Sequence, residues 1–228
     1  VDYNLMTTIN GLFATGEANF SDHGANRLGA SALMQCLADG YFIAPQTVAN
    51  YLARSQFEEI DDNHPEVVAS LESVKARIGK LMNAPKPEHS PDYFHQKLGR
   101  ILWNACGMSR EKQALKAAMK DISELESEFW QSIKVTGSES DFNQTLEKAG
   151  RVADFIELGY LMCRDAIDRE ESCGAHARLE FLAESGDAKR DDENYSHVAA
   201  WEFQNGTPVL HKEHLHFEFI KPSVRDYK

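Results

Sequence analysis

The chain has 228 residues, which is long enough to bury a sizeable core as one large domain or two small ones. Its formal net charge is −12, from 36 acidic and 24 basic residues, and this argues against binding to nucleic acid or to an anionic membrane surface. No apolar run approaches the roughly 20 residues of a membrane span, and no signal peptide is expected. The four cysteines form no CxxC pair and are expected to be reduced, mostly buried thiols of a cytosolic protein: Cys36, Cys106, Cys163 and Cys173.

The first element that the pattern predicts is a buried strand over Gly11–Thr15, because residues 12–14 form a continuous apolar run. A turn of small and polar residues follows, and an apolar helix is predicted from about Asn26 to a stop at Gly40. Such a strand–loop–helix edge directs backbone N–H groups and the positive end of the helix toward whatever lies over the loop. Taken alone, the pattern also fits an ordinary connection that carries polar residues.

Five helices are predicted in the middle of the chain. Pro45 and Pro65 suit the first positions of two of them, and Ser90–Pro91 gives the third a capping hydroxyl with a proline just inside. Ser109 is expected to cap the fourth, and the fifth spans roughly Phe142–Arg169. The last three carry apolar stripes that predict an antiparallel three-helix bundle: Phe94, Leu98, Ile101, Leu102 and Ala105; Leu115, Met119, Ile122, Leu125, Phe129 and Ile133; Leu146, Val152, Ile156, Gly159, Cys163 and Ala166.

The last segment is predicted to form a β-hairpin, since Asn205–Gly206 is a strong two-residue turn signal. Apolar residues alternate on both sides of it: Ala199, Trp201 and Phe203 before, and Leu215, Phe217 and Phe219 after. His211, His214 and His216 raise the alternative of a metal site, because an HxH pair on a strand puts both rings on one side. Zinc needs further ligands at fixed geometry, so a polar strand is favoured and no metal site is predicted.

The stretch GEANFSDHGANRLGASAL at Gly16–Leu33 resembles the flavin- and substrate-contacting segment of the succinate dehydrogenase/fumarate reductase flavoprotein family. That family has GE, a short variable run, HGANRLG and a small-residue helix start. LGRILWNACGMSREKQAL, from residue 98, resembles the start of its helical domain. ESCGAHAR at Glu171–Arg178 resembles its ESRGAHxR motif, with Cys173 where arginine is commoner, and the terminal RDYK resembles its end.

The resemblance implies roles for the first stretch. Arg27 would clamp a carboxylate of succinate or fumarate, which suits a planar and permanently charged guanidinium, and His23 and Ala30 would also bind the substrate. Glu17 would accept a hydrogen bond from a ribose hydroxyl of FAD. The other cofactor contacts would come from the helix start, with backbone N–H groups facing the pyrimidine edge of the flavin: Asn26, Ser31, Ala32 and Leu33. The alternatives are a surface arginine at residue 27 and a turn acid at residue 17.

The resemblance also implies the domain plan and the fold class. Residues 1–54 would be the C-terminal part of an FAD-binding domain, residues 55–170 a helical bundle domain, and residues 171–228 a C-terminal segment with the hairpin. The fold class is therefore expected to be mainly α. Glu171–Arg178 is expected to act as a structural hinge, and Lys189–Glu193 as a solvated charged turn.

In the family, FAD exchanges a hydride with the central carbons of succinate or fumarate, and electrons pass through an iron–sulfur subunit to quinone. The expected partners are that subunit and a membrane anchor subunit, which would hold the protein at the inner face of the cell membrane. The sequence has no GxGxxG fingerprint, flavin-linking histidine or capping-domain proton donor, so it is expected to be part of a longer flavoprotein. No catalytic residue is expected within it, and alone it is expected to be inactive and not to hold FAD.

Two alternatives stay open. An L-aspartate oxidase-like flavoenzyme shares HGANRLxS and needs no iron–sulfur partner, although the ADGYF and RDD segments and the terminal RDYK favour the succinate/fumarate branch. The other alternative is a helical assembly module without catalysis.

Overall fold

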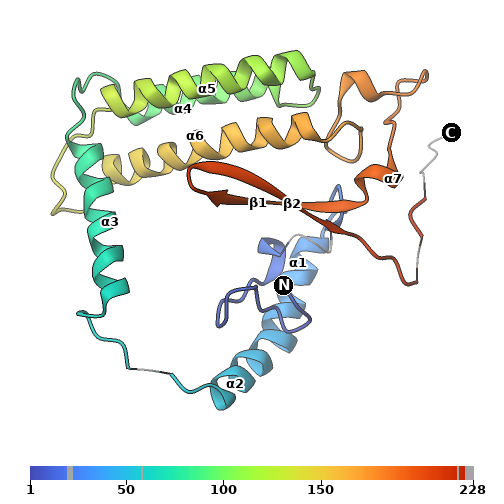
Figure 1. Cartoon of the computed structure of the whole chain (residues 1–228), viewed down its shortest axis with the longest axis horizontal. Helices are drawn as coiled ribbons and strands as arrows, with labels where there is room; N and C mark the ends of the chain where they lie inside the picture. The colour runs from blue at the N-terminus through green and yellow to red at the C-terminus, as the bar shows by residue number, and fades with distance from the viewer. Residues whose placement is uncertain (20–22, 58, 220, 224–228) are drawn as a thin grey trace. The chain divides into compact units, whose positions relative to one another are not determined.

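The computed structural model describes residues 1–19, 23–57, 59–219 and 221–223 (Figure 1). The chain divides into two compact units, Val1–Ser73 and Val74–Lys228. The described elements confirm the mainly α class. In chain order they are a 3-10 turn at Gly16–Ala18, α1 Ser31–Ala38, a π-helical turn Asp39–Ile43, α2 Ala44–Arg54, α3 Pro65–Met82, α4 Pro91–Ala105, α5 Lys112–Ser132, α6 Gln144–Asp168, a 3-10 turn at Leu179–Phe181, α7 Asp192–Tyr195, β1 His197–Gln204 and β2 Thr207–His214.

The segment Gly11–Thr15 does not form the predicted buried strand. Phe13 makes one isolated bridge with Met6, and Leu12 is 51% exposed. A buried strand needs neighbouring strands to satisfy its backbone groups, and the described part of the first unit offers this segment only the turn around Met6. The prediction was wrong because an apolar run specifies burial but cannot supply the partners of a sheet.

The helix predicted from about Asn26 to Gly40 begins at Ser31 and does not stop at Gly40, so both predicted bounds were wrong. The backbone widens into a π-helical turn over Asp39–Ile43 and continues directly into α2. Pro45, in the first turn of α2, has no N–H to give to the carbonyl four residues before it. A wider turn ahead of the proline accommodates the missing hydrogen bond without ending the helix.

The predicted three-helix bundle is confirmed, and Figure 1 shows α4, α5 and α6 running alongside one another. The expected stripes form its core, with Phe94, Leu115, Phe129 and Cys163 fully buried. The rings of Phe94 and Phe129 meet edge to face at 5.1 Å, which ties α4 to α5. Burial of these stripes is the main stabilising contribution in the second unit.

The start of α4 is as predicted, because the Ser90 hydroxyl accepts a hydrogen bond from the Tyr93 N–H. Helix α6 begins at Gln144, close to the predicted Phe142, and the Asn143 side chain caps it by accepting the Leu146 N–H. Ser109 does not cap α5, whose N-cap residue is Glu111. A distant carboxylate, Glu180, accepts the Lys112 N–H instead, at 2.6 Å.

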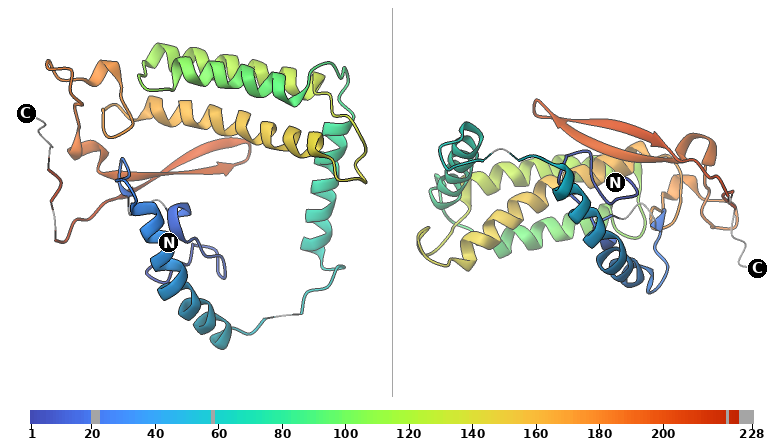
Figure 2. Two further views of the ribbon diagram at one scale, coloured as in Figure 1. Left: turned by 180° about the vertical axis from the view of Figure 1, so that it is seen from behind. Right: turned by 90° about the horizontal axis from the view of Figure 1, so that it is seen from below.

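The hairpin is confirmed with Asn205 and Gly206 at the turn, both at positive φ (50° and 83°). Its two antiparallel strands form the ribbon seen from behind and from below in Figure 2. The Trp201 ring nitrogen donates to Asp165 of α6 at 2.8 Å, so β1 is attached to the bundle. The second strand ends at His214, and Phe217 and Phe219 are exposed, so the apolar alternation predicted after residue 214 does not mark a strand. The turn fixes a register in which His197, the first residue of β1, pairs with His214. Residues after His214 therefore have no partner residues left in β1.

Two expectations near the end of the chain have different outcomes. Within Lys189–Glu193 the structure has the start of the short helix α7, capped by the Asp191 carboxylate, rather than only a charged turn. The terminal RDYK segment, at residues 225–228, lies outside the described residues.

Candidate functional site

A tight turn positions Glu17 in the first unit. Gly16 has φ +62°, and a Cβ there would lie 3.3 Å from the Cβ of Cys36, so both the conformation and the close approach favour glycine. The Gly16 N–H donates to the Asp39 carboxylate at 2.8 Å, and Asp39 is only 5% exposed. Asp39 therefore holds the turn that carries Glu17. This role was not predictable from the sequence, since one acid in a helical run has no local signal for a partner 23 residues away.

Glu17 and Arg27, which the resemblance assigned to two different ligands, form one ion pair. Arg27 Nε lies 2.6 Å from Glu17 Oε1, and the side chains are 43% and 55% exposed. Arg27 is thus neither buried nor directed into a core. A ligand carboxylate that approaches its guanidinium would meet a partner already in place, and Asn26 beside it is exposed.

Helix α1 begins with backbone donors that no described side chain caps. Ala30, the N-cap residue, is in the left-handed region at φ +62°, which a non-glycine residue rarely adopts. The first bond within the helix runs from the Met34 N–H to the Ala30 carbonyl (3.1 Å), so the N–H groups of Ser31, Ala32 and Leu33 precede the ladder. They point outward from the positive end of the helix, the arrangement that donates hydrogen bonds to a polar ring edge or to an anion.

The Ser31 hydroxyl is turned away from the capping position. It donates to the Leu28 carbonyl at 2.8 Å and lies 3.5 Å from Nδ1 of His23. The other ring nitrogen of His23, Nε2, is buried and has no hydrogen-bond partner within the described residues. An unpaired buried nitrogen costs free energy, which a ligand group could recover. The structure therefore brings His23, Ala30 and Ser31 together, and Glu17 and Arg27 as a separate pair.

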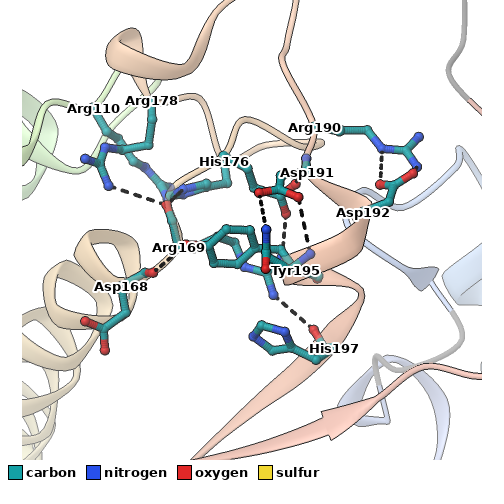
Figure 3. A network of polar contacts seen from close by, with 12 residues as sticks. Arg110, Asp168, Arg169, His176, Arg178, Arg190, Asp191, Asp192, Tyr195 and His197 are labelled. Atoms are coloured by element: carbon teal, nitrogen blue, oxygen red, sulfur yellow. Dashed lines mark hydrogen bonds and ion pairs between the residues drawn. The ribbon is translucent and has the colours of Figure 1, made fainter.

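A second polar cluster follows α6 and is shown in Figure 3. We call residues 171–180 the capping loop, because their side chains satisfy the ends of two bundle helices. Arg178 is 1% exposed and donates to the carbonyls of Ala166 and Ile167 at the end of α6, at 2.8 and 3.3 Å. Its Nε donates to Glu180 at 3.0 Å, and Glu180 in turn accepts the first N–H of α5. Arg178 therefore links the end of α6 to the start of α5 through Glu180.

Arg169, at the end of α6, links the capping loop to the hairpin. It pairs with Glu171, which is 3% exposed, at 2.7 Å. It also donates to the carbonyls of Tyr195 and His197, at 3.1 and 3.0 Å (Figure 3). The other oxygen of Glu171 accepts the Asp191 N–H at 2.8 Å. These contacts fix the segment that was expected to be a hinge.

His176 in the same loop is neutral and held from both sides. Its Nε2–H donates to the Arg169 carbonyl at 2.9 Å, and its Nδ1 accepts from Arg110, also at 2.9 Å. Burial, followed by the positive charges of Arg110, Arg169 and Arg178, lowers the pKa of His176 below its ordinary value. The Arg110 guanidinium is thereby fixed beside the end of α4.

The histidines of the hairpin do not gather into a ligand set. His211 Nε2 pairs with Glu202 at 2.7 Å across the strands, and the ring of His214 lies against that of His197. In the ranges that the structure covers, no group of three or more His, Cys, Asp or Glu side chains could hold a metal ion. Nor is any described helix both long and apolar enough to cross a membrane.

Comparisons with known proteins give one family. Residues 95–227 match the fumarate reductase flavoprotein C-terminal family. The chain is 30% identical over 229 residues to the fumarate reductase flavoprotein subunit of Haemophilus influenzae, with 100% of this chain and 36% of that protein covered. It is also similar to the L-aspartate oxidase of a Nostoc species, with 26% identity over 190 residues, 77% of this chain and 31% of the relative.

Among solved structures, a quinol-fumarate reductase with menaquinol molecules is similar with a TM-score of 0.79 and 25% identity, over 96% of this chain and 37% of that one. The chain thus spans about a third of the length of the fumarate reductase flavoproteins that it matches. The chain belongs to the succinate dehydrogenase/fumarate reductase flavoprotein subunit family, and it corresponds to the C-terminal part of those subunits.

Proposed function

We propose that the chain is the C-terminal part of an FAD-dependent flavoprotein subunit that interconverts succinate and fumarate. The main supporting observation is that Arg27 lies half exposed on the loop that leads into the uncapped start of α1. A guanidinium suits a dicarboxylate, and uncapped helical N–H groups suit a flavin ring. The family membership supports both assignments.

The residues at the start of α1 fit a flavin. The N–H groups of Ser31, Ala32 and Leu33 would hold the pyrimidine edge, with Asn26 beside them, and Glu17 would accept a ribose hydroxyl. FAD bound there would supply hydride transfer to and from the substrate. Because reduction places negative charge on the pyrimidine edge, the positive end of α1 would stabilise the reduced cofactor.

Arg27, His23 and Ala30 would bind the substrate. Arg27 would donate two parallel N–H groups to one carboxylate, and His23 Nε2 would gain the partner that it lacks. The small side chain of Ala30 would let the ligand approach the backbone. Because Glu17 now pairs with Arg27, binding would require Glu17 to turn toward the ribose and release the guanidinium.

The proposal extends to the assembly and its location. An iron–sulfur subunit and a membrane anchor subunit would receive the electrons and pass them to quinone, at the inner face of the cell membrane. The menaquinol molecules in the similar quinol-fumarate reductase support the quinone partner. Residues 1–54 would complete the FAD-binding domain, 55–170 would form the helical domain and 171–228 the C-terminal segment, and the chain alone would not turn over.

An L-aspartate oxidase-like activity is the second candidate, favoured by the similarity to the Nostoc enzyme. The two reactions share the need for an arginine opposite a carboxylate. They differ in substrate, since L-aspartate carries an amino group that a succinate site has no reason to accommodate. Activity with one substrate and not the other separates them.

A chimera tests the proposal. The chain is placed behind the preceding part of the Haemophilus influenzae flavoprotein subunit, and the product is assayed for a flavin absorption band and for fumarate-dependent oxidation of a reduced dye. L-aspartate is the alternative substrate. A folded chimera that binds FAD but neither reduces fumarate nor oxidises L-aspartate would contradict the enzyme proposal. It would favour the alternative of a helical assembly module without catalysis.

Within that chimera, Arg27→Lys is expected to raise the KM for fumarate roughly ten- to a hundredfold, because a single ammonium replaces a two-donor fork. The flavin band should be unchanged. Arg54→Lys is the matched control, since Arg54 is an exposed arginine of the same unit, at the end of α2. Equal KM values for Arg27→Lys and the parent would exclude Arg27 from the substrate site.

A further inference from the structure

Two buried cysteines from different helices meet in the bundle. Cys106 ends α4 and is 7% exposed, and Cys163 lies on α6 and is fully buried. One turn earlier on each helix, a Cβ added at Gly159 would lie 3.2 Å from Cδ1 of Leu102, so α4 and α6 approach closely there. Since residues 106 and 163 each lie four positions further on, the next turn brings the two thiols together.

A hydrogen bond from the Cys163 thiol, against the opposing effect of burial and with help from the charge of Arg110, lowers the pKa of Cys106 to about 7. The same hydrogen bond and burial raise the pKa of Cys163. The pair therefore has one nucleophilic sulfur and one that keeps its proton.

Arg110 is fixed in place for this role. Its Nε donates to the Gly107 carbonyl at 3.3 Å, and its Nη1 donates to Nδ1 of His176 at 2.9 Å (Figure 3). His176 is neutral, so it positions the guanidinium without cancelling its charge. A positive charge held beside a slightly accessible cysteine is the environment of redox-reactive thiols.

We propose that Cys106 and Cys163 form a redox-active dithiol site, which a peroxide converts into an intramolecular disulfide that joins the end of α4 to α6. The proposal goes beyond the succinate/fumarate activity and does not depend on it.

The chemistry balances over two steps. The Cys106 thiolate attacks one oxygen of hydrogen peroxide, the O–O bond breaks, and the departing hydroxide takes a proton to leave as water, which gives a sulfenic acid at Cys106. The Cys163 sulfur then attacks the sulfenic sulfur and gives up its proton, the S–O bond breaks, and a second water leaves. The two thiols lose two electrons and two protons in total, and the peroxide is reduced to two waters.

The other two cysteines serve as internal controls. Cys36 is exposed and belongs to the first unit, so it is open to oxidation but has no neighbouring thiol of the same unit. Cys173 is half-buried, and burial followed by the charge of Glu171 raises its pKa. Neither combines a low pKa with a second thiol as Cys106 does.

The experiment treats the full chain with hydrogen peroxide under native conditions, alkylates the remaining thiols and maps peptides by mass spectrometry. The expected result is a peptide pair joined through Cys106 and Cys163 that disappears on reduction, with its yield independent of protein concentration. Circular dichroism before and after oxidation checks that the fold persists. Oxidation confined to Cys36 and Cys173, or a Cys106–Cys163 link that forms only in urea, would overturn the proposal.

Two matched variants separate the donor from the resolving thiol. Cys163→Ser keeps a hydroxyl donor and should leave a sulfenic acid at Cys106 that dimedone traps. Cys163→Ala removes the donor as well, and its dimedone labelling should be roughly tenfold slower near pH 7, since fewer Cys106 sulfurs are ionised. Equal labelling rates in the two variants, or no labelling of Cys106 in either, would contradict the assigned roles.

Discussion

Arg178 shows how much a single side chain contributes to the second unit. Its guanidinium is buried, donates to carbonyls at the end of α6 and holds Glu180, which caps α5. The charge is compensated by one carboxylate and several carbonyl dipoles, which is the condition under which a buried charge is tolerated. A lysine could not reproduce it, because its single ammonium cannot reach the α6 carbonyls and Glu180 from separate nitrogens.

Replacing Arg178 with Met should therefore destabilise the second unit by about 3–5 kcal/mol, since it leaves the α6 carbonyls and Glu180 without their donor. Urea unfolding followed by circular dichroism measures the change. Arg151→Met is the control, because Arg151 makes only an exposed pair with Glu147, within one helix, and should change stability by less than about 0.5 kcal/mol. Equal midpoints for the two variants would show that Arg178 contributes no more than a surface residue.

Glu180 makes the stability depend on acid pH. Although partial burial opposes it, hydrogen bonds from Arg178 and from the Lys112 N–H lower the pKa of Glu180 to about 2, below the ordinary 4.5. Because the folded-state pKa is depressed, this stabilisation is complete above about pH 4.5 and is lost as the pH falls toward 2. Glu180→Gln should flatten this part of the stability–pH profile, whereas Glu184→Gln, an exposed acid nearby, should not. An unchanged acid profile in Glu180→Gln would refute the assignment.

The local sequence predicts the buried faces of the helices better than it predicts how their ends are capped. The stripes on α4, α5 and α6 were predictable because helical spacing is local and places Phe94, Ile122 or Cys163 on a buried face. The start of α5 was not predictable, since Glu180, its cap, lies 68 residues further along the chain. In the candidate site, sequence identifies which residues gather on the loop, but the Glu17–Arg27 pair depends on how the loop folds back.

The contact between α4 and α6 can be tested at Gly159. Alanine normally stabilises a helix by about 1 kcal/mol relative to glycine. Gly150→Ala should show this gain, because no atom lies within 4 Å of a Cβ there. Gly159→Ala should lose most or all of it, because its Cβ would press on Leu102 and Leu98 at 3.2 and 3.3 Å. Thermal unfolding of both variants measures the difference, and an equal gain would mean that the helices have room to separate.

On the scale of the whole chain, the segment between α2 and α3 differs from the capping loop in how firmly it is held. Residues 55–57 and 59–64 contain no helix or strand, and Phe57 is exposed. The capping loop, by contrast, is held by Arg169, Arg178 and Glu180 to the end of α6 and the start of α5, at one end of the bundle. Although the resemblance separates residues 171–228 from the bundle, these contacts couple the capping loop to the helices energetically.

Limited proteolysis should reflect this difference. Chymotrypsin is expected to cut after Phe57 early, because that segment is accessible and has no regular backbone bonding to break. Trypsin should spare Arg178 until the second unit unfolds. Mass spectrometry of timed samples identifies the fragments. Early tryptic cleavage at Arg178 in the native chain would show that the capping loop opens independently of the bundle.

The position of the capping loop along the chain also affects folding during synthesis. The first N–H of α5 and the last carbonyls of α6 find their partners only in residues made after both helices. While the ribosome still encloses residues 178–180, α4, α5 and α6 can pair their apolar faces but remain frayed at these ends. A nascent chain arrested just after α6 should thus yield under a smaller pulling force than one arrested far enough downstream to free Glu180.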